Sequence, residues 1–166
     1  MPLSGTVMYE GEFKQIQEIL QRLCQESNAR AAFLIDRNGQ PIASTGENIE
    51  EMDSTSLASL TAGNVASTDA LAKLIGEKEF SVLFHEGEKD NLHISMVGNK
   101  AILMILFDER SSLGLVRLRV RKATGELAGI FDSIDEKVAA ERAKGTSAES
   151  PFAEITDADI DALFSQ

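Results

Sequence analysis

The residue types that most often carry out chemistry are few in this chain and widely spaced. The two histidines, His85 and His93, lie eight positions apart and lack the neighbouring carboxylates and cysteines of a metal site. Cys24 is the only cysteine and lies near the apolar face of a predicted helix, which favours a packed thiol over a nucleophile. Neither G-x-x-x-x-G-K-[ST] nor G-x-G-x-x-G occurs. We therefore expect no catalytic site, no cofactor and no metal ion.

One group of arginines could act on a phosphoryl group, because guanidinium groups stabilise the charge that develops during phosphoryl transfer. The group consists of Arg110, Arg117, Arg119 and Arg121. The last three alternate with Leu118 and Val120. The other interpretation places them on the solvent face of the last helix or on the segment that leads into it, and we favour this second interpretation.

Composition excludes several classes of partner. The chain has 166 residues and a formal net charge of −11, so it repels nucleic-acid backbones and anionic membrane surfaces. It has no Trp and one Tyr, too few aromatics for base stacking. The longest apolar run, Ala101 to Phe107, is far short of a membrane span. With a single cysteine and no visible signal peptide, we expect a cytoplasmic protein that binds no nucleic acid and does not insert into membranes.

Hydrophobic spacing and turn residues predict the order α-β-β-α-β-β-β-α. The predicted elements are a helix at 9–27, strands at 30–36 and 40–45, a helix at 53–76, strands at 81–86, 91–98 and 100–107, and a helix at 113–141. Pro41 indicates an edge strand. Short connections predict an antiparallel five-stranded sheet in an α/β (α+β layered) domain over 7–141, with the helices on one face. A linker at 142–151 and a short amphipathic segment at 152–166 would follow.

The predicted helix at 53–76 has an unusual outer face. We expect its core face to consist of Leu57, Leu60, Leu71, Leu74 and Ile75. The opposite face carries Ala58, Ala62, Ala66 and Ala70, where a solvent-exposed face would carry charges. Asp69 and Lys73 are its only charges and could pair. We interpret the alanine face as a protein interface, such as an isologous dimer contact. Burial between layers of the same domain is the alternative.

The C-terminal segment is a second candidate contact. Thr156 could cap a short helix, and the segment from Glu149 to Gln166 carries five acidic residues and no Lys or Arg. Its apolar residues are Phe152, Ile155, Ile160, Leu163 and Phe164. Apolar anchors on an acidic peptide suggest a helix that binds in a groove of a partner. A solubilising acidic tail is the alternative.

Several segments together resemble the MglB family of bacterial polarity proteins, in the roadblock (dynein light chain) superfamily. The most extended is DSTSLASLTAGNVA at 53–66. The others are LAKLIG at 71–76, FHEG at 84–87, LFD at 106–108, SLGLVRLR at 112–119, SPFAEI at 150–155 and DADIDALF at 157–164. The resemblance extends from Val7 to the end of the chain.

This resemblance implies a roadblock fold and a homodimer whose second helices lie side by side. It also implies a platform that binds the GTP-bound form of a small Ras-like GTPase of the MglA type, at a cell pole. Activation of GTP hydrolysis would come from remodelling the switch regions of the GTPase, without an arginine finger. The C-terminal segment would contact the GTPase separately and promote nucleotide exchange. The implied dimer and GTPase surface comprises Ala58, Ala62, Ala66, Asp69, Ala70 and Lys73.

Two other classes of function remain open. The first is a dimeric adaptor that binds a GTPase without activating it. The second is a small-molecule sensor with a five-stranded sheet. A sensor should carry polar residues that point inward among the strands, and the segment Ala101 to Phe107 has none. We therefore rank the sensor last.

Overall fold

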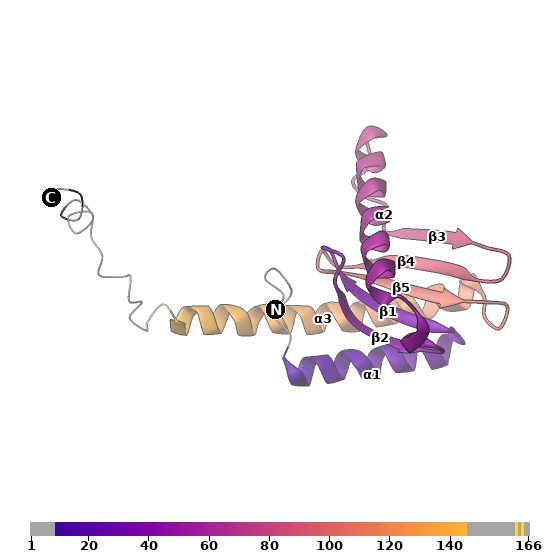
Figure 1. Ribbon diagram of the computed structural model, residues 1–166, viewed down its shortest axis with the longest axis horizontal. Helices are drawn as coiled ribbons and strands as arrows, with labels where there is room; N and C mark the ends of the chain where they lie inside the picture. Colours follow the sequence, from indigo (N-terminus) through magenta and orange to yellow (C-terminus); the bar gives the residue numbers. More distant parts are fainter. Residues whose placement is uncertain (1–8, 146–161, 163, 165–166) are drawn as a thin grey trace. The chain divides into compact units, whose positions relative to one another are not determined.

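The computed structural model describes residues 9–145, Ala162 and Phe164 (Figure 1). The elements are α1 (Glu10–Ser27), β1 (Ala31–Asp36), β2 (Pro41–Gly46), the short 3₁₀ helix η1 (Ile49–Glu51), α2 (Ser54–Leu74), β3 (Val82–Glu86), β4 (Asn91–Val97), β5 (Ala101–Phe107) and α3 (Leu113–Gly145). Apart from η1, their order is the predicted one. The chain therefore has the order of helices and strands that its sequence predicts.

Local side-chain chemistry explains where several elements begin and end. The Asp36 carboxylate accepts hydrogen bonds from the backbone N–H groups of Asn38 and Gln40, both at 2.9 Å, which closes the β1–β2 turn. Asp53 caps α2 by accepting a hydrogen bond from the Ser56 N–H at 3.1 Å. Gly76 follows α2 with a φ of +80°, a conformation that favours glycine. These boundaries are readable from the sequence because neighbouring residues determine them.

The five strands form one sheet in the order β2-β1-β5-β4-β3, and every pairing is antiparallel. The central strand β5 pairs with β1 on one side and β4 on the other. Strand β2 lies at one edge, as the proline at its start predicts. Strand β3 forms the opposite edge.

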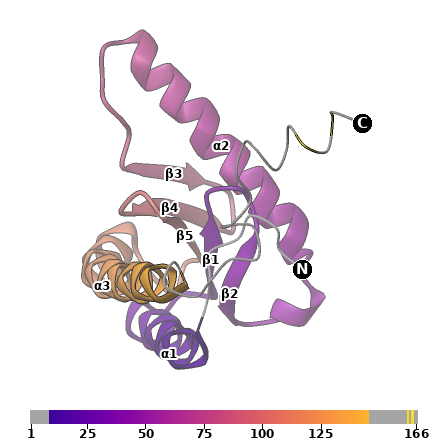
Figure 2. The same ribbon diagram turned by 90° about the vertical axis from the view of Figure 1, so that its left-hand side faces the viewer.

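Helices cover both faces of this sheet, so the prediction that they pack on one face is wrong. Helix α2 lies on one face, and α1 and the start of α3 lie on the other (Figure 2). On the α2 side, Phe33, Ile102 and Met104 form a buried cluster with Ala58 and Val65. Alternate residues of β1 and β5 point to the opposite face and are also fully buried. Strands that are apolar at nearly every position require cover on both sides.

The chain divides into two compact units, residues 1–134 and 135–166. The first unit contains the sheet, α1, α2 and the beginning of α3. The second contains the end of α3, together with Ala162 and Phe164, which are helical. Within the described residues, no helix combines the length and the apolar character that a membrane span requires.

Candidate functional site

Helix α2 contacts the sheet through small side chains, and its leucines point elsewhere. The residues of α2 that are buried are Ala58, Thr61, Val65 and Ala72. Leu60, Leu71, Leu74 and Ile75 are between 57% and 83% exposed. The predicted core face of this helix is therefore wrong, except for the partly buried Leu57, which packs against the core.

Close approach of the β1–β2 turn explains this orientation. A Cβ built at Gly39, at the tip of the turn, would lie 3.1 Å from the Cα of Ser59 and 3.4 Å from the Cβ of Ala62. Larger side chains on this face of α2 would push the turn away from the helix. Ala58 and Ala62 therefore serve the packing of the domain, and the leucines are left on the surface.

This arrangement buries some of the predicted interface residues of α2 and leaves others exposed. Ala58 is 1% exposed and belongs to the core, so its assignment to a surface is wrong for the isolated chain. Ala62 is half-buried against the same core, and Asp69 pairs with Arg37 at 3.5 Å, so the suggested Asp69–Lys73 pair is not formed. The residues of the set that are exposed are Ala66, Ala70 and Lys73.

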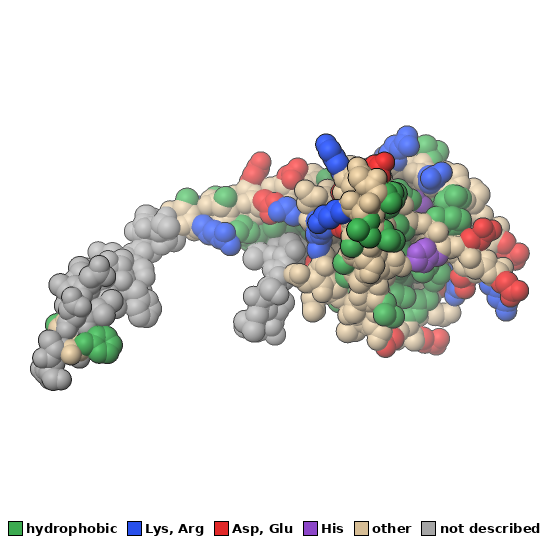
Figure 3. Space-filling model, turned by 90° about the horizontal axis from the view of Figure 1, so that it is seen from above, with side chains coloured by type: hydrophobic (Ala, Val, Ile, Leu, Met, Phe, Trp, Pro, Cys, Tyr) green, Lys and Arg blue, Asp and Glu red, His purple; other side chains and the backbone are tan. Residues whose placement is uncertain are grey.

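The exposed surface of α2 carries large apolar and very small side chains together. We call Leu60, Leu71, Leu74 and Ile75 the leucine face. Leu60 and Leu71 are eleven residues apart, so they project within about 20° of each other. Gly63, Ala66 and Ala70 are also exposed, on the neighbouring strip of the helix. Figure 3, which looks along α2 from its C-terminal end, shows hydrophobic side chains gathered around it. Contiguous exposed apolar surface is typical of protein-binding sites.

Edge strand β3 and Phe80 before it also expose apolar side chains, but Val82 and Phe84 lie on the face of the sheet opposite α2, where their partners Ser95 and His93 also lie. Phe80, Val82 and Phe84 are each 38% or 39% exposed. The ring of Phe84 stacks on that of Phe107, with centroids 6.1 Å apart. Along its outer side β3 has no neighbouring strand in the sheet, so its backbone groups are available to another chain.

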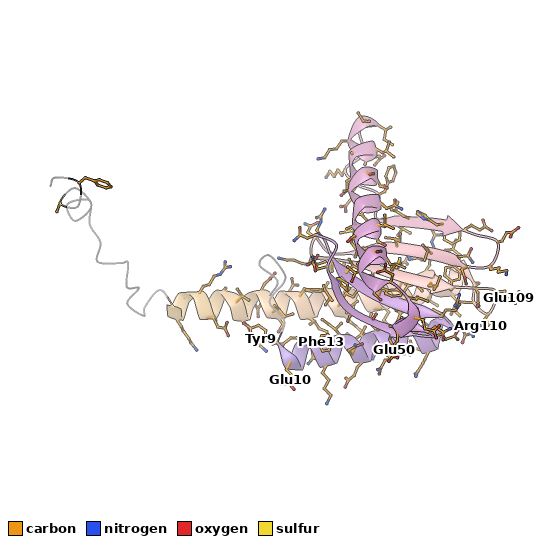
Figure 4. All side chains as sticks on the ribbon, in the orientation of Figure 1. Tyr9, Glu10, Phe13, Glu50, Glu109 and Arg110 are labelled. Atoms are coloured by element: carbon orange, nitrogen blue, oxygen red, sulfur yellow. The ribbon has the colours of Figure 1, made fainter. Side chains whose placement is uncertain are left out.

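Of the four arginines that could act on a phosphoryl group, Arg110 and Arg119 form ion pairs within the chain. Arg110, in the β5–α3 connection (Figure 4), contacts both oxygens of Glu47, with Nη–Oε distances of 2.7 and 3.0 Å. Its Nε also donates to Asp108 at 3.0 Å. These hydrogen bonds lower the pKa of Glu47 and of Asp108. The Nη1 of Arg119 lies 3.6 Å from the Oε2 of Glu26 in α1.

The two histidines and the cysteine differ in their burial and in their neighbours. The Nε2 of His85 lies 3.4 Å from the amide nitrogen of Asn64. His93 is 1% exposed, and burial, followed by the nearby charge of Arg117, lowers its pKa. Burial raises the pKa of Cys24 to about 11, so its thiol is protonated at neutral pH. The described part of the chain contains no group of three His, Cys, Asp or Glu residues that could hold a metal ion.

Four of the five predicted contact residues of the C-terminal segment lie outside the described residues: Phe152, Ile155, Ile160 and Leu163. The fifth, Phe164, is 84% exposed. The contact assigned to this segment therefore stays a prediction.

Sequence reasoning missed two groups of residues. It assigned the leucine face to the core, although Asn64 and Ser67 interrupt the apolar pattern between Leu60 and Leu71. It considered His93 only as a metal ligand or an ordinary strand residue, and did not predict that His93 and Ser95, which alternate with apolar residues along β4, are both buried. Two polar residues on the same side of a strand, between apolar neighbours, are a pattern that is visible in a sequence and can indicate buried polar groups.

Comparisons with known proteins agree with this architecture. Among solved structures, MglB of Myxococcus xanthus is 55% identical, with a TM-score of 0.72, over 77% of this chain and 96% of that chain. The gliding protein MglB of Thermus thermophilus is 36% identical, with a TM-score of 0.74, over 79% of this chain and 99% of that chain. An MglB with a tetrameric arrangement is 35% identical, with a TM-score of 0.75, over 80% and 99% of the two chains. No curated protein matches the chain.

The Roadblock/LC7 domain family matches residues 15–107. This range begins within α1 and ends with β5, so it contains the whole sheet and α2. The order of the strands, the packing of α2 on one face of the sheet and the similarity to MglB structures lead to one assignment: the chain belongs to the Roadblock/LC7 domain family.

Proposed function

We propose that the chain is a homodimeric activator of a small Ras-like GTPase of the MglA type, which it binds in the GTP-bound form. The observation that carries this proposal is the 55% identity to MglB of Myxococcus xanthus over 96% of that chain. The leucine face supports it, because α2, the helix that the resemblance places at the dimer contact, exposes large apolar side chains in this structure, although not the residues that were predicted.

A second copy of the chain is the proposed occupant of the leucine face. Two α2 helices that meet about a two-fold axis would bury Leu60, Leu71 and Leu74 from both copies. Gly63 and Ala66 project little and would allow the two backbones to approach closely. Four exposed, large aliphatic side chains on one helix are unfavourable in water, and association would remove them from it. The MglB structure at 35% identity has a tetrameric arrangement, so assembly occurs among similar chains.

Activation without an arginine finger is supported by the ion pairs of Arg110 and Arg119. Arg117 and Arg121 form no such pair among the described residues, and for them the proposal rests on the resemblance to MglB. A finger must be free to reach the phosphates of a bound nucleotide. Arg110 has both edges of its guanidinium group engaged by Glu47 and Asp108. We therefore propose that the chain positions the switch regions of the GTPase, which supplies its own catalytic groups.

Single-turnover GTP hydrolysis by the cognate MglA-type GTPase, with and without the full chain, tests the proposal. We expect an acceleration of roughly tenfold or more, which corresponds to about 1.4 kcal/mol removed from the barrier. The second candidate is a non-activating dimeric adaptor, which would bind the same GTPase and leave the rate unchanged. An unchanged rate with confirmed binding would therefore reject the activator and favour the adaptor.

The Arg110→Ala variant should retain GTPase stimulation to within about threefold, whereas loss of an arginine finger lowers the rate by roughly 10³ to 10⁵-fold. The same assay with Arg119→Ala is the matched control, because Arg119 is also held in an ion pair. A loss of several orders of magnitude for Arg110→Ala, with GTPase binding intact, would show that a finger operates.

Deletion of residues 150–166 should weaken GTPase binding or nucleotide exchange, since the proposal assigns a separate GTPase contact to this segment. Binding can be followed by titration with the GTPase, and exchange by release of a fluorescent guanine nucleotide. The segment from Glu149 to Gln166 carries five acidic residues, so a variant with all five changed to Asn or Gln separates charge from apolar contact. Unchanged binding and exchange after the deletion would exclude the contact.

A further inference from the structure

A cleft of about 500 Å³ lies between strands β3 and β4 and helix α3. Its polar lining comes mainly from His93 and Ser95 of β4 and from Arg117, Arg121 and Thr124 of α3. The cleft lies on the face of the sheet opposite α2, so it is separate from the leucine face. All its lining residues belong to the first compact unit of the chain.

Two buried polar side chains line this cleft without a hydrogen-bond partner. His93 is 1% exposed and Ser95 is 6% exposed. Neither ring nitrogen of His93 nor the Oγ of Ser95 finds a partner among the described residues. Buried polar groups are normally hydrogen-bonded, because leaving them unsatisfied costs the free energy of their desolvation. The cleft therefore contains donors positioned for a group from outside the chain.

Two arginines at the cleft carry charge that the described part of the chain does not neutralise. Arg117 and Arg121 are four residues apart on α3, so they project from the same side of the helix. Neither has a carboxylate partner in the described ranges, and no acidic side chain lines the cleft. In contrast, a carboxylate lies within 4 Å of each of Arg22, Arg30, Arg37, Arg110 and Arg119. Two uncompensated cations are unusual in a protein of net charge −11.

We propose that this cleft binds the phosphate group of a small phosphate monoester. A phosphate monoester carries a charge of about −1.5 to −2 at neutral pH, which matches two guanidinium groups. Guanidinium groups bind phosphate oxygens with two parallel hydrogen bonds, and the imidazole N–H and the serine hydroxyl supply two further donors. A ligand with a single carboxylate group would neutralise only one of the two guanidinium groups.

The apolar part of the lining indicates the chemical character of the group that carries the phosphate. The side chains of Val82 and Val120 border the cleft beside its polar groups. An ester with an apolar body would contact them while its phosphate occupies the cationic end. Such a site goes beyond regulation of a GTPase and gives the chain the ligand-binding property of the sensor class. The inward polar residues expected of a sensor lie on β4, whereas the apolar segment that argued against a sensor is β5.

Isothermal titration calorimetry on the full-length chain, at constant ionic strength, tests the site with three probes. Phenyl phosphate has both the dianion and an apolar body, inorganic phosphate has only the dianion, and benzoate has the ring with one negative charge. We expect phenyl phosphate to bind at one site per chain and more tightly than either of the others. Absence of saturable binding, or equal affinity for benzoate, would overturn the proposal.

A matched pair of double variants locates the site. Arg117→Gln/Arg121→Gln should weaken phenyl phosphate binding roughly tenfold or more, because each lost contact is a charge-assisted hydrogen bond. Arg119→Gln/Lys122→Gln removes the same charge from the same helix but outside this cleft, beside α1, and should leave affinity within about twofold. Equal losses in both variants would indicate non-specific attraction and reject the site. Thermal unfolding of each variant confirms that it is folded.

Ser95→Ala removes one buried donor and leaves both arginines in place. We expect it to weaken phenyl phosphate binding by several-fold, because the hydroxyl no longer donates to the phosphate. Unchanged affinity would show that the phosphate does not reach the floor of the cleft and would contradict the proposed pose. The three variants together therefore test the charge, the location and the depth of the site.

Discussion

The double variant Leu71→Glu/Leu74→Glu is expected to lose self-association and, with it, the stimulation of GTP hydrolysis. Both side chains are exposed in the single chain, so their replacement should leave its fold intact. In the proposed dimer each glutamate would be buried against an apolar surface, or would face its own copy across the two-fold axis. Central contact residues each contribute about 2 kcal/mol or more, so the dissociation constant should rise by roughly a hundredfold or more.

Sedimentation equilibrium measures the loss of self-association, and the single-turnover assay measures the loss of activation. Leu118→Glu is the matched control, since Leu118 is 63% exposed but lies on α3, away from the leucine face. It should behave as the unmodified chain in both measurements. A dimer that survives the double variant would remove the leucine face from the proposed interface, even if GTPase stimulation were lost.

Substitution Leu103→Ala should produce the largest loss of stability among single changes to the sheet. Leu103 lies in the central strand β5, is completely buried, and pairs with Leu34 and Ser95 on the flanking strands. Truncation removes buried apolar surface and leaves a cavity in a close-packed layer, which costs about 3 to 5 kcal/mol. Such a loss is a large fraction of the total stability of a small domain.

Urea unfolding followed by far-UV circular dichroism measures this difference. Leu118→Ala is the matched control, because it makes the same chemical change at an exposed residue and should cost less than about 0.5 kcal/mol. Both variants are compared at one protein concentration, since the proposed self-association would contribute to apparent stability. A similar loss for the two variants would show that the outer side of α3 is covered in solution.

Much of the fold could be predicted because short-range chemistry determines it. The carboxylate of Asp36, two residues before Asn38, closes the first hairpin turn through contacts within five residues. Asp53 begins α2 in the same local manner. The edge position of β2 also followed from one residue, because Pro41 cannot donate a backbone hydrogen bond to a sheet. None of these features requires knowledge of a distant part of the chain.

The orientation of α2 could not be predicted, because its sequence contains two different apolar faces. One consists of small residues such as Ala58 and Val65, and the other is the leucine face. Helical periodicity identifies both faces but carries no information about what packs against each. Hydrophobicity favoured the leucines, and the approach of Gly39 in the β1–β2 turn favours the alanines. This close contact determines the orientation of α2, because bulky side chains cannot fit between the helix and the β1–β2 turn.

The sequence by itself therefore determined the elements, their order and their ends, since these depend on residues close together in the chain. Only the tertiary structure decided which faces are covered and which side chains meet. His93 and Arg117 lie 24 positions apart, on a strand and a helix, and share a cleft because α3 crosses the sheet beside β4. Burial is a property of the assembled layers, so the uncovered leucines and the unpartnered histidine are visible only after the chain has folded.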